Sequence, residues 1–119
     1  LRWPSTSSSV LEKLSLPEKV RKALEQFVEA IGRLYPDARI YLFGSYAKGT
    51  WLEDSDIDLV VVSRAFEGMS FWERGAVLRR LASREVAFEI LAYTPEELKE
   101  ALRRSITIQD AAEYWVRLR

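Results

Sequence analysis

The sequence predicts a small α/β domain in which a mixed sheet of three to four strands is flanked by about four helices. Two observations predict this class: helix-type apolar spacing alternates along the chain with short strand-type runs, and 119 residues provide for one hydrophobic core. Because neither an internal repeat nor a second domain is visible, residues 15–119 are expected to form a single domain. Residues 1–14 contain Pro4 and a run of Ser and Thr, and they are expected to be a flexible lead-in.

Three helix starts are predicted from capping signals, at residues 15–18, 70–73 and 94–97. Each stretch has a Ser or Thr followed three residues later by Glu, and two of them have an early Pro. Apolar residues then recur at spacings of three and four, so each helix has one side that faces a core. The helix after residue 70 is expected to bury Phe71, Leu78 and Leu81.

Three strands are predicted from apolar runs at residues 39–43, 56–63 and 86–93. The first run is apolar on both faces, which is typical of an inner strand. Alternation in the second run places its two aspartates on one face. The last segment, residues 106–119, is compatible with a helical turn or with an edge strand. The alternation of side chains near its C-terminal end favours the strand.

Composition excludes several kinds of chemistry. The chain has no Cys and no His, which removes thiol nucleophiles, the Ser-His-Asp arrangement and the usual zinc sites. Any metal must therefore be held by oxygen ligands, which select Mg²⁺ or Mn²⁺. The formal net charge is zero, so an extended nucleic-acid partner is not expected. Without a membrane-length apolar run or a signal-peptide pattern, we expect a cytoplasmic protein with no membrane partner.

Asp56, Asp58 and Glu89 are the candidate metal ligands. Asp56 and Asp58 stand at i and i+2 of one predicted strand, so their like charges repel unless a cation compensates. Glu89 is in the middle of an otherwise apolar strand, where an ionised carboxylate is costly unless it is paired or metal-bound. We expect Glu89 inside the fold; the alternatives are an exposed Glu89 at a sheet edge, or one paired with an Arg. If the three acids converge, a divalent metal makes the cluster stable.

The stretch from Gly44 to Lys48 supplies the complementary half of the site. Gly44 lets a bulky anion approach the backbone, the Ser45 hydroxyl adds a donor, and Lys48 one turn on adds positive charge. A nucleoside triphosphate carries about four negative charges and would be repelled by three carboxylates, whereas two Mg²⁺ ions between them make the interaction attractive. The combined pattern therefore predicts phosphoryl or nucleotidyl transfer.

Gly44-Ser45, followed after ten residues by Asp56-Ile57-Asp58, resembles the signature of the polymerase-beta-like nucleotidyltransferase superfamily. Glu89 matches the position of that superfamily's third carboxylate. Residues 93–98 are similar to its small prokaryotic, "minimal" members, which are antitoxin-like. The resemblance covers roughly residues 17–103 and implies the nucleotidyltransferase fold.

The resemblance also implies a role for each matching residue. Asp56 and Asp58 would bind both Mg²⁺ ions, while Glu89 would bind one ion and act as the base toward the acceptor hydroxyl. Gly44-Ser45, assisted by Lys48, would hold the β- and γ-phosphates. The acceptor oxygen would then attack the α-phosphorus and release pyrophosphate. The superfamily more often has Asp where this chain has the longer Glu89, a difference that bears on activity more than on fold.

Two functions from different classes stay open. In the first, the protein moves a nucleoside monophosphate, AMP from ATP, onto an acceptor hydroxyl of a partner; minimal members resemble antitoxins encoded beside a HEPN-domain ribonuclease toxin and can adenylylate it on tyrosine. In the second, a catalytically weak or inactive interaction module binds nucleotide or metal and neutralises a partner protein. A nucleic-acid polymerase is disfavoured by the zero net charge and the missing template-binding region. Exposed aromatics would favour the interaction module, and the candidates are Trp3, Trp51, Trp72 and Trp115.

Overall fold

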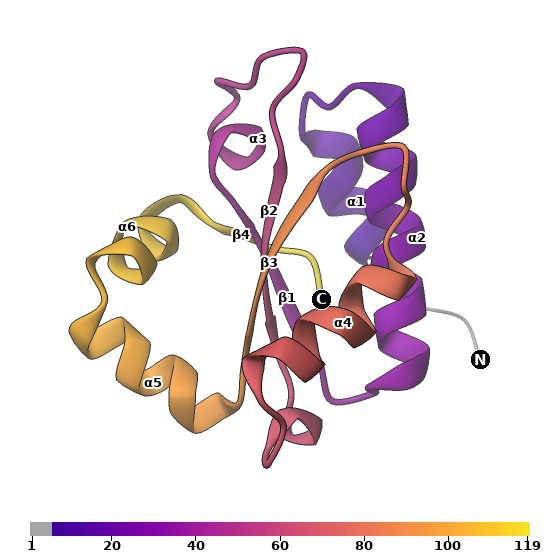
Figure 1. Cartoon of the computed structure of the whole chain (residues 1–119). Helices are drawn as coiled ribbons and strands as arrows, with labels where there is room; N and C mark the ends of the chain where they lie inside the picture. The colour runs from indigo at the N-terminus through magenta and orange to yellow at the C-terminus, as the bar shows by residue number, and fades with distance from the viewer. Residues whose placement is uncertain (1–5) are drawn as a thin grey trace.

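The fold is built around a four-stranded mixed sheet in the order β3-β2-β1-β4 (Figure 1). The computed structural model describes residues 6–119. The central strands β1 (Arg39–Phe43) and β2 (Ile57–Val62) are antiparallel, β2 pairs in parallel with β3 (Phe88–Tyr93), and β1 pairs antiparallel with β4 (Val116–Arg117). The small mixed sheet and the inner position of residues 39–43 are therefore confirmed.

Helices cover both faces of this sheet. Their bounds are Thr6–Lys13 for α1, Glu18–Leu34 for α2, Ser45–Lys48 for α3, Phe71–Leu81 for α4, Pro95–Arg104 for α5 and Ile106–Tyr114 for α6. Figure 1 shows α1, α2 and α4 on one side of the sheet and α5 and α6 on the other, with the one-turn α3 beyond the end of β1. No helix in the described part of the chain is long and apolar enough to cross a membrane.

Each face of β2 packs into a separate hydrophobic cluster. Ile57, Leu59 and Val61 lie in the cluster on the side of α1, α2 and α4. Val60 and Val62 lie in the cluster on the side of α5 and α6. Burying one such aliphatic side chain contributes about 1.5–3 kcal/mol, so the alternation of this strand fixes which face its carboxylates occupy. The predicted alternation is confirmed.

Two of the three predicted helix caps are confirmed. Ser70 and Glu73 form a capping box at the start of α4, and Thr94 and Glu97 form another at the start of α5. Each box satisfies backbone N–H groups that a helix start leaves unpaired. The predicted Ser15 cap is wrong, because α2 begins without a side-chain cap hydrogen bond.

The two ends of the chain differ from their predictions. Part of the expected lead-in, residues 1–14, forms α1, and its Leu11 is buried in the core at 1% exposure. That apolar contact explains why a helix forms there; residues 1–5 lie outside the described part. At the other end, α6 occupies Ile106–Tyr114 and is followed by the two-residue edge strand β4, so both open alternatives are partly right.

Helix α4 buries a different residue from the one predicted. Phe71 was expected in the core, but its side chain is 65% exposed. Arg74 is instead only 3% exposed, and its guanidinium lies 4.8 Å from the ring centroid of Phe71. The helix is therefore rotated so that its arginine, rather than its first aromatic residue, faces inward.

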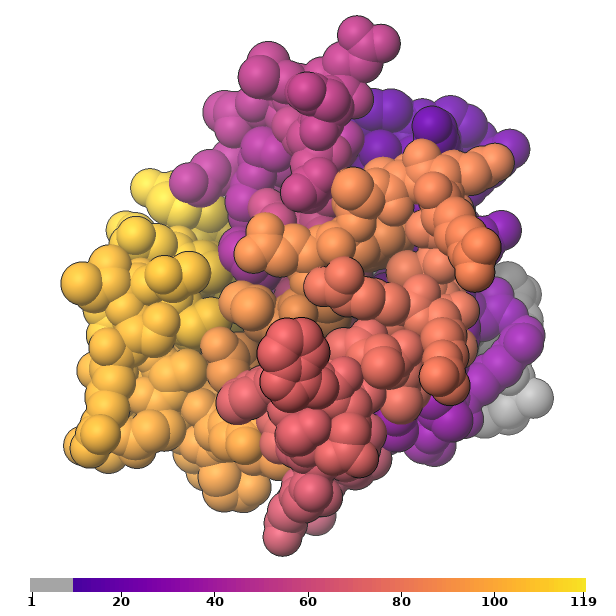
Figure 2. All heavy atoms as spheres, in the orientation of Figure 1, coloured from indigo at the N-terminus to yellow at the C-terminus, as the bar shows by residue number. Residues whose placement is uncertain are grey.

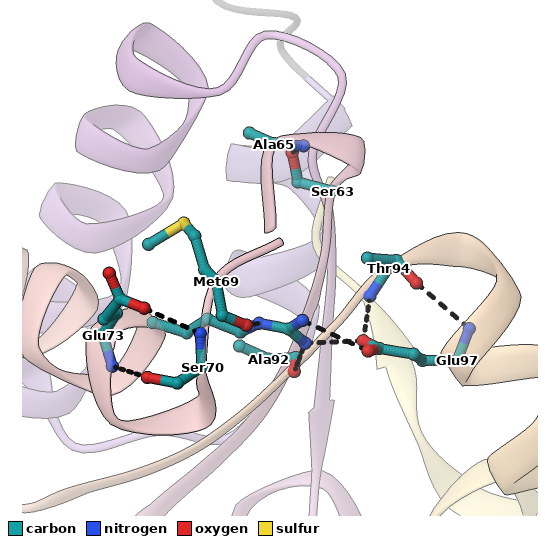
Figure 3. Close-up of polar contacts among 9 residues, drawn as sticks. Ser63, Ala65, Met69, Ser70, Glu73, Ala92, Thr94 and Glu97 are labelled. Atoms are coloured by element: carbon teal, nitrogen blue, oxygen red, sulfur yellow. Dashed lines mark hydrogen bonds and ion pairs between the residues drawn. The ribbon is translucent and has the colours of Figure 1, made fainter. Parts of the chain in front are cut away.

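Arg74 is buried where α4, β3 and α5 meet. Its Nε donates to the Met69 carbonyl at 3.1 Å, and its Nη1 donates to the Ala92 carbonyl at 3.1 Å. Nη1 and Nη2 also donate to the two carboxylate oxygens of Glu97, at 2.5 and 3.1 Å. Figure 3 shows this network between Met69 on one side and Glu97 on the other. Because a buried charge is tolerated only when paired, these bonds join the two helical layers across one end of the sheet.

Candidate nucleotide and metal site

Gly44 occupies a sharp turn between β1 and α3. Its backbone has φ 74° and ψ −155°, in a region that residues with a side chain rarely adopt. A Cβ atom at this position would lie 2.1 Å from Oδ2 of Asp58. Two independent constraints, backbone conformation and space, therefore require glycine here, and they place the Gly44-Ser45 turn directly against the Asp58 carboxylate.

Asp58 and Glu89 are cross-strand neighbours. They are paired in the register of the parallel strands β2 and β3, so their side chains lie on the same face of the sheet. Burial raises the pKa of Asp58 to about 6, with further contributions from the negative charges of Glu89 and Asp56 and from the hydrogen bond with Glu89. Two ionised carboxylates at these positions would repel each other, and a bound cation would relieve that repulsion.

The position of Glu89 corrects one prediction. Glu89 is exposed, because β3 is an edge strand of the sheet, so the expectation of a carboxylate inside the fold is wrong and the edge-strand alternative holds. Glu89 nevertheless lies on the same side of the sheet as Asp58, with which it is paired in register.

Asp56 lies beside this pair rather than within it. It is exposed, it precedes the first residue of β2, and its charge contributes to the raised pKa of Asp58. Within residues 6–119, no group of three or more Asp, Glu, His or Cys side chains is close enough together to hold a metal ion. The structure therefore brings together Gly44, Asp58 and Glu89, and it leaves Asp56 at their margin.

The donor set fits a hard divalent cation. Asp58 and Glu89 offer carboxylate oxygens, and Mg²⁺ is usually held by one or two carboxylates, with water and substrate phosphates completing the shell. A third protein carboxylate is therefore not required for the site to accept Mg²⁺. The raised pKa of Asp58 points the same way, since a bound cation would offset the repulsion.

Two tyrosines at the site escaped prediction. The Tyr46 hydroxyl of α3 donates to the Ser55 carbonyl at 3.2 Å, which ties the glycine turn to the loop that carries Asp56. The Tyr114 ring of α6 lies 5.1 Å from Nζ of Lys48, and this contact holds the exposed lysine near the turn. Neither contact has a local sequence signal, because each depends on how distant segments pack.

The Asp58 pKa predicts how stability depends on pH in the absence of divalent cations. The folded-state value, about 6, lies above the reference value of 3.8, so the folded protein holds this proton more tightly than the unfolded chain. This contribution is present near pH 4 and is lost as the pH rises through about 6. Relative to the wild type, Asp58→Asn should therefore gain about 1 kcal/mol of stability near pH 8, after allowance for solvent screening, and little near pH 4. Urea unfolding at the two pH values measures this difference, and an equal difference at both would contradict it.

Taken together, a glycine turn after β1 and paired carboxylates at the starts of β2 and β3, on a small mixed sheet, define a nucleotidyltransferase-type domain. Residues 24–114 match the nucleotidyltransferase domain family, and the chain belongs to that family. The resemblance carried by Gly44-Ser45 and Asp56-Ile57-Asp58 is thereby confirmed at the level of the family.

Among curated proteins, the chain is similar to one from Methanocaldococcus jannaschii, named "Putative protein adenylyltransferase MJ0604". The two are 46% identical over 43 residues, a stretch that covers 34% of this chain and 43% of the relative. The similarity is therefore confined to less than half of either protein.

Three solved structures share the fold. A "putative nucleotidyltransferase" from Sulfolobus solfataricus has a TM-score of 0.57 at 20% identity and covers 84% of each chain. A chain from a structure of a toxin-antitoxin with AMP-PNP has a TM-score of 0.53 at 23% identity, covering 80% of this chain and 71% of its own. A further "putative nucleotidyltransferase" has a TM-score of 0.50 at 29% identity, covering 67% of this chain and 87% of its own. The nucleotidyltransferase fold is thereby confirmed.

Proposed function

We propose that this protein transfers AMP from ATP, with Mg²⁺, onto an acceptor hydroxyl of a partner protein. The observation that supports the proposal is the position of the Asp58 carboxylate, which lies against Gly44 and is paired with Glu89 across the parallel strands β2 and β3. The turn that we propose binds phosphate therefore lies next to the carboxylate that we propose holds the cation, as transfer from a nucleoside triphosphate requires.

Asp58 and Glu89 would hold Mg²⁺, and Asp56 would be a further ligand. Bound there, Mg²⁺ would neutralise phosphate charge and would stabilise the attacking and leaving oxygens. Gly44-Ser45 binds the β- and γ-phosphates, because glycine leaves the backbone open to a bulky anion. The Lys48 ammonium adds the one positive charge of this segment.

Glu89 acts as the base for the acceptor. The acceptor hydroxyl loses its proton to the Glu89 carboxylate as its oxygen forms a bond to the α-phosphorus. The bond from the α-phosphorus to the bridging oxygen breaks, and pyrophosphate leaves. The exposure of Glu89 at the edge of the sheet supports this role, because a macromolecular acceptor can reach the carboxylate from solvent.

A protein hydroxyl is the acceptor class that the relatives favour. The curated relative is named a protein adenylyltransferase, and one neighbour in fold comes from a toxin-antitoxin structure with AMP-PNP. A HEPN-type toxin with an accessible tyrosine is the specific partner we propose.

The second candidate is an interaction module that binds nucleotide without transferring it. The observation that favours it is the exposed aromatic surface of α4, where the Trp72 side chain is 89% exposed. The other aromatic candidates give it less support, because Trp51 packs against Tyr46 and Trp115 packs against Tyr41; Trp3 lies outside the described residues. Label transfer separates the two candidates.

The test compares wild type, Glu89→Gln and the matched control Glu67→Gln, which changes an exposed glutamate after β2. With Mg²⁺ and [α-³²P]ATP in an extract of its source cells, the wild type and the control should label a protein, whereas [γ-³²P]ATP should not. Glu89→Gln should keep ATP binding by calorimetry and lose at least about 100-fold in transfer, the usual contribution of a general base. Unchanged transfer in Glu89→Gln would remove Glu89 from the base role. Binding without transfer in any variant would favour the interaction module.

A further inference from the structure

Helix α4 presents two aromatic side chains and an arginine on its solvent-exposed side, next to the edge strand β3. Trp72 and Phe71 are 89% and 65% exposed, unusual values for the two bulkiest side chains of a helix. A hollow of about 510 Å³ lies between this face and the edge strand β3, and it is lined by Phe71, Trp72, Gly75, Ala76, Arg79 and Ile90. In Figure 2 the side chains of α4 face the viewer and border those of β3.

The cations of this face are available for a contact outside the chain. Arg79 is exposed and forms no ion pair with any residue from 6 to 119. Phe71 already lies against the buried Arg74, at 4.8 Å from the guanidinium carbon to the ring centroid. The Trp72 ring has no such contact within the described residues, although indole is the ring that binds cations best.

Two copies of α4 packed antiparallel would place complementary side chains opposite each other. In a pair of antiparallel helices related by a two-fold axis, residue i meets residue j and j meets i. An axis between Gly75 and Ala76 would place Trp72 of each copy at the height of Arg79 of the other. Gly75 and Ala76 would face each other at the crossing point, where small residues let two helix backbones approach closely.

We infer that this face binds a second copy of the same chain, with α4 packed antiparallel against α4 of its partner. A second copy fits this face because each copy would place its Trp72 ring against the Arg79 guanidinium of the other. Two cation–π contacts then flank a close helix crossing, and Ile90 of each copy extends the apolar area along the sheet edge.

This interface leaves the nucleotide site open. Ile90 belongs to the hydrophobic cluster on the α4 side of the sheet, whereas Glu89, its neighbour in the chain, points to the opposite face with Asp58. The inference therefore does not depend on the proposed function, and ATP binding should be the same in dimeric and monomeric variants.

Disulfide trapping with an introduced cysteine tests the antiparallel packing of the two α4 helices. The chain has no Cys of its own, so no other disulfide can form. Ala76→Cys, near the proposed axis, should form an intermolecular disulfide rapidly under mild oxidation. The matched control is Ala65→Cys, an equally exposed alanine on the turn after β2, which should form it at least about tenfold more slowly. Equal rates would overturn the inference.

Sedimentation equilibrium from micromolar to millimolar protein tests the contact residues. Wild type should dimerise, and Trp72→Ala should weaken the dimer at least about tenfold, as expected for a central aromatic residue. Arg79→Ala should weaken it as well, and the double variant should lose less than the product of the two single effects, because the two residues share one contact. Arg33→Ala, an exposed arginine on α2, is the control and should have no effect. A monomer at every concentration would overturn the inference and would indicate that this face binds a different protein. A dimer whose affinity neither substitution changes would also overturn it.

Discussion

Arg74→Ala should lower the free energy of unfolding by at least about 2 kcal/mol, because it removes a buried side chain that donates to two main-chain carbonyls and to Glu97. Arg74 is 3% exposed, and its guanidinium satisfies the carbonyls of Met69 and Ala92 together with the Glu97 carboxylate. Removing it takes the Arg74 donor away from both carbonyls, leaves Glu97 without its counter-charge, and opens a cavity between α4 and α5. Urea unfolding followed by circular dichroism measures the loss.

The matched control is Arg80→Ala, an exposed arginine on the same helix, which should change stability by no more than about 0.5 kcal/mol.

The dependence of stability on acid pH provides a second readout for Arg74→Ala. Hydrogen bonding from Arg74 is the largest cause of the lowered Glu97 pKa, so this pair stabilises the fold above the ordinary pKa of glutamate and is lost as the pH falls through the lowered value. Arg74→Ala should flatten that part of the stability profile. A variant as stable as the Arg80→Ala control would show that the network contributes nothing net.

Gly44→Ala should abolish binding of ATP with Mg²⁺ and destabilise the fold by at least about 2 kcal/mol. The new Cβ would lie 2.1 Å from the Asp58 carboxylate oxygen, in a backbone conformation with φ 74°. Either the carboxylate moves away or the turn opens, and both changes separate the turn proposed to bind phosphate from the carboxylate proposed to bind the cation. Calorimetry with ATP and Mg²⁺, together with urea unfolding, gives the two readouts.

Gly49→Ala separates the two causes. Gly49 has nearly the same φ, 78°, but a Cβ there would meet no atom within 4 Å. It should therefore show the conformational cost alone, about 1 kcal/mol, with ATP binding retained. If the two alanine variants bind ATP equally well, the contact between Gly44 and Asp58 has no part in binding.

Local sequence signals predicted the parts of the fold that depend on local physics. The two capping boxes and the alternation in β2 follow from hydrogen bonding and side-chain direction within a few residues, and both were confirmed. The pairing of Asp58 with Glu89 was also within reach, because each residue stands early in a strand and faces the same side.

The remaining features depend on the order of the strands and on packing between distant segments. Glu89 looked buried because its neighbours are apolar, yet strand order places β3 at the edge, and nothing within residues 86–93 records that order. Phe71 looked like a core residue because the sequence does not reveal that the distant Glu97 gives the buried Arg74 an ion-pair partner. Helix α1 was missed because its main reason to form is the burial of Leu11 against a distant α2.

Most of the candidate site residues lie within one continuous segment, formed by the antiparallel strands β1 and β2 and their connection. Gly44, Ser45 and Asp56 lie in the connection between β1 and β2, and Asp58 lies on β2, whereas Glu89 lies on β3, a separate strand at the edge of the sheet. In the proposed function, nucleotide binding and proton removal would therefore belong to separate parts of the chain. One substitution at Glu89 would then remove the second and leave the hairpin to bind ATP, so that an enzyme and a nucleotide-binding protein would differ by a single residue.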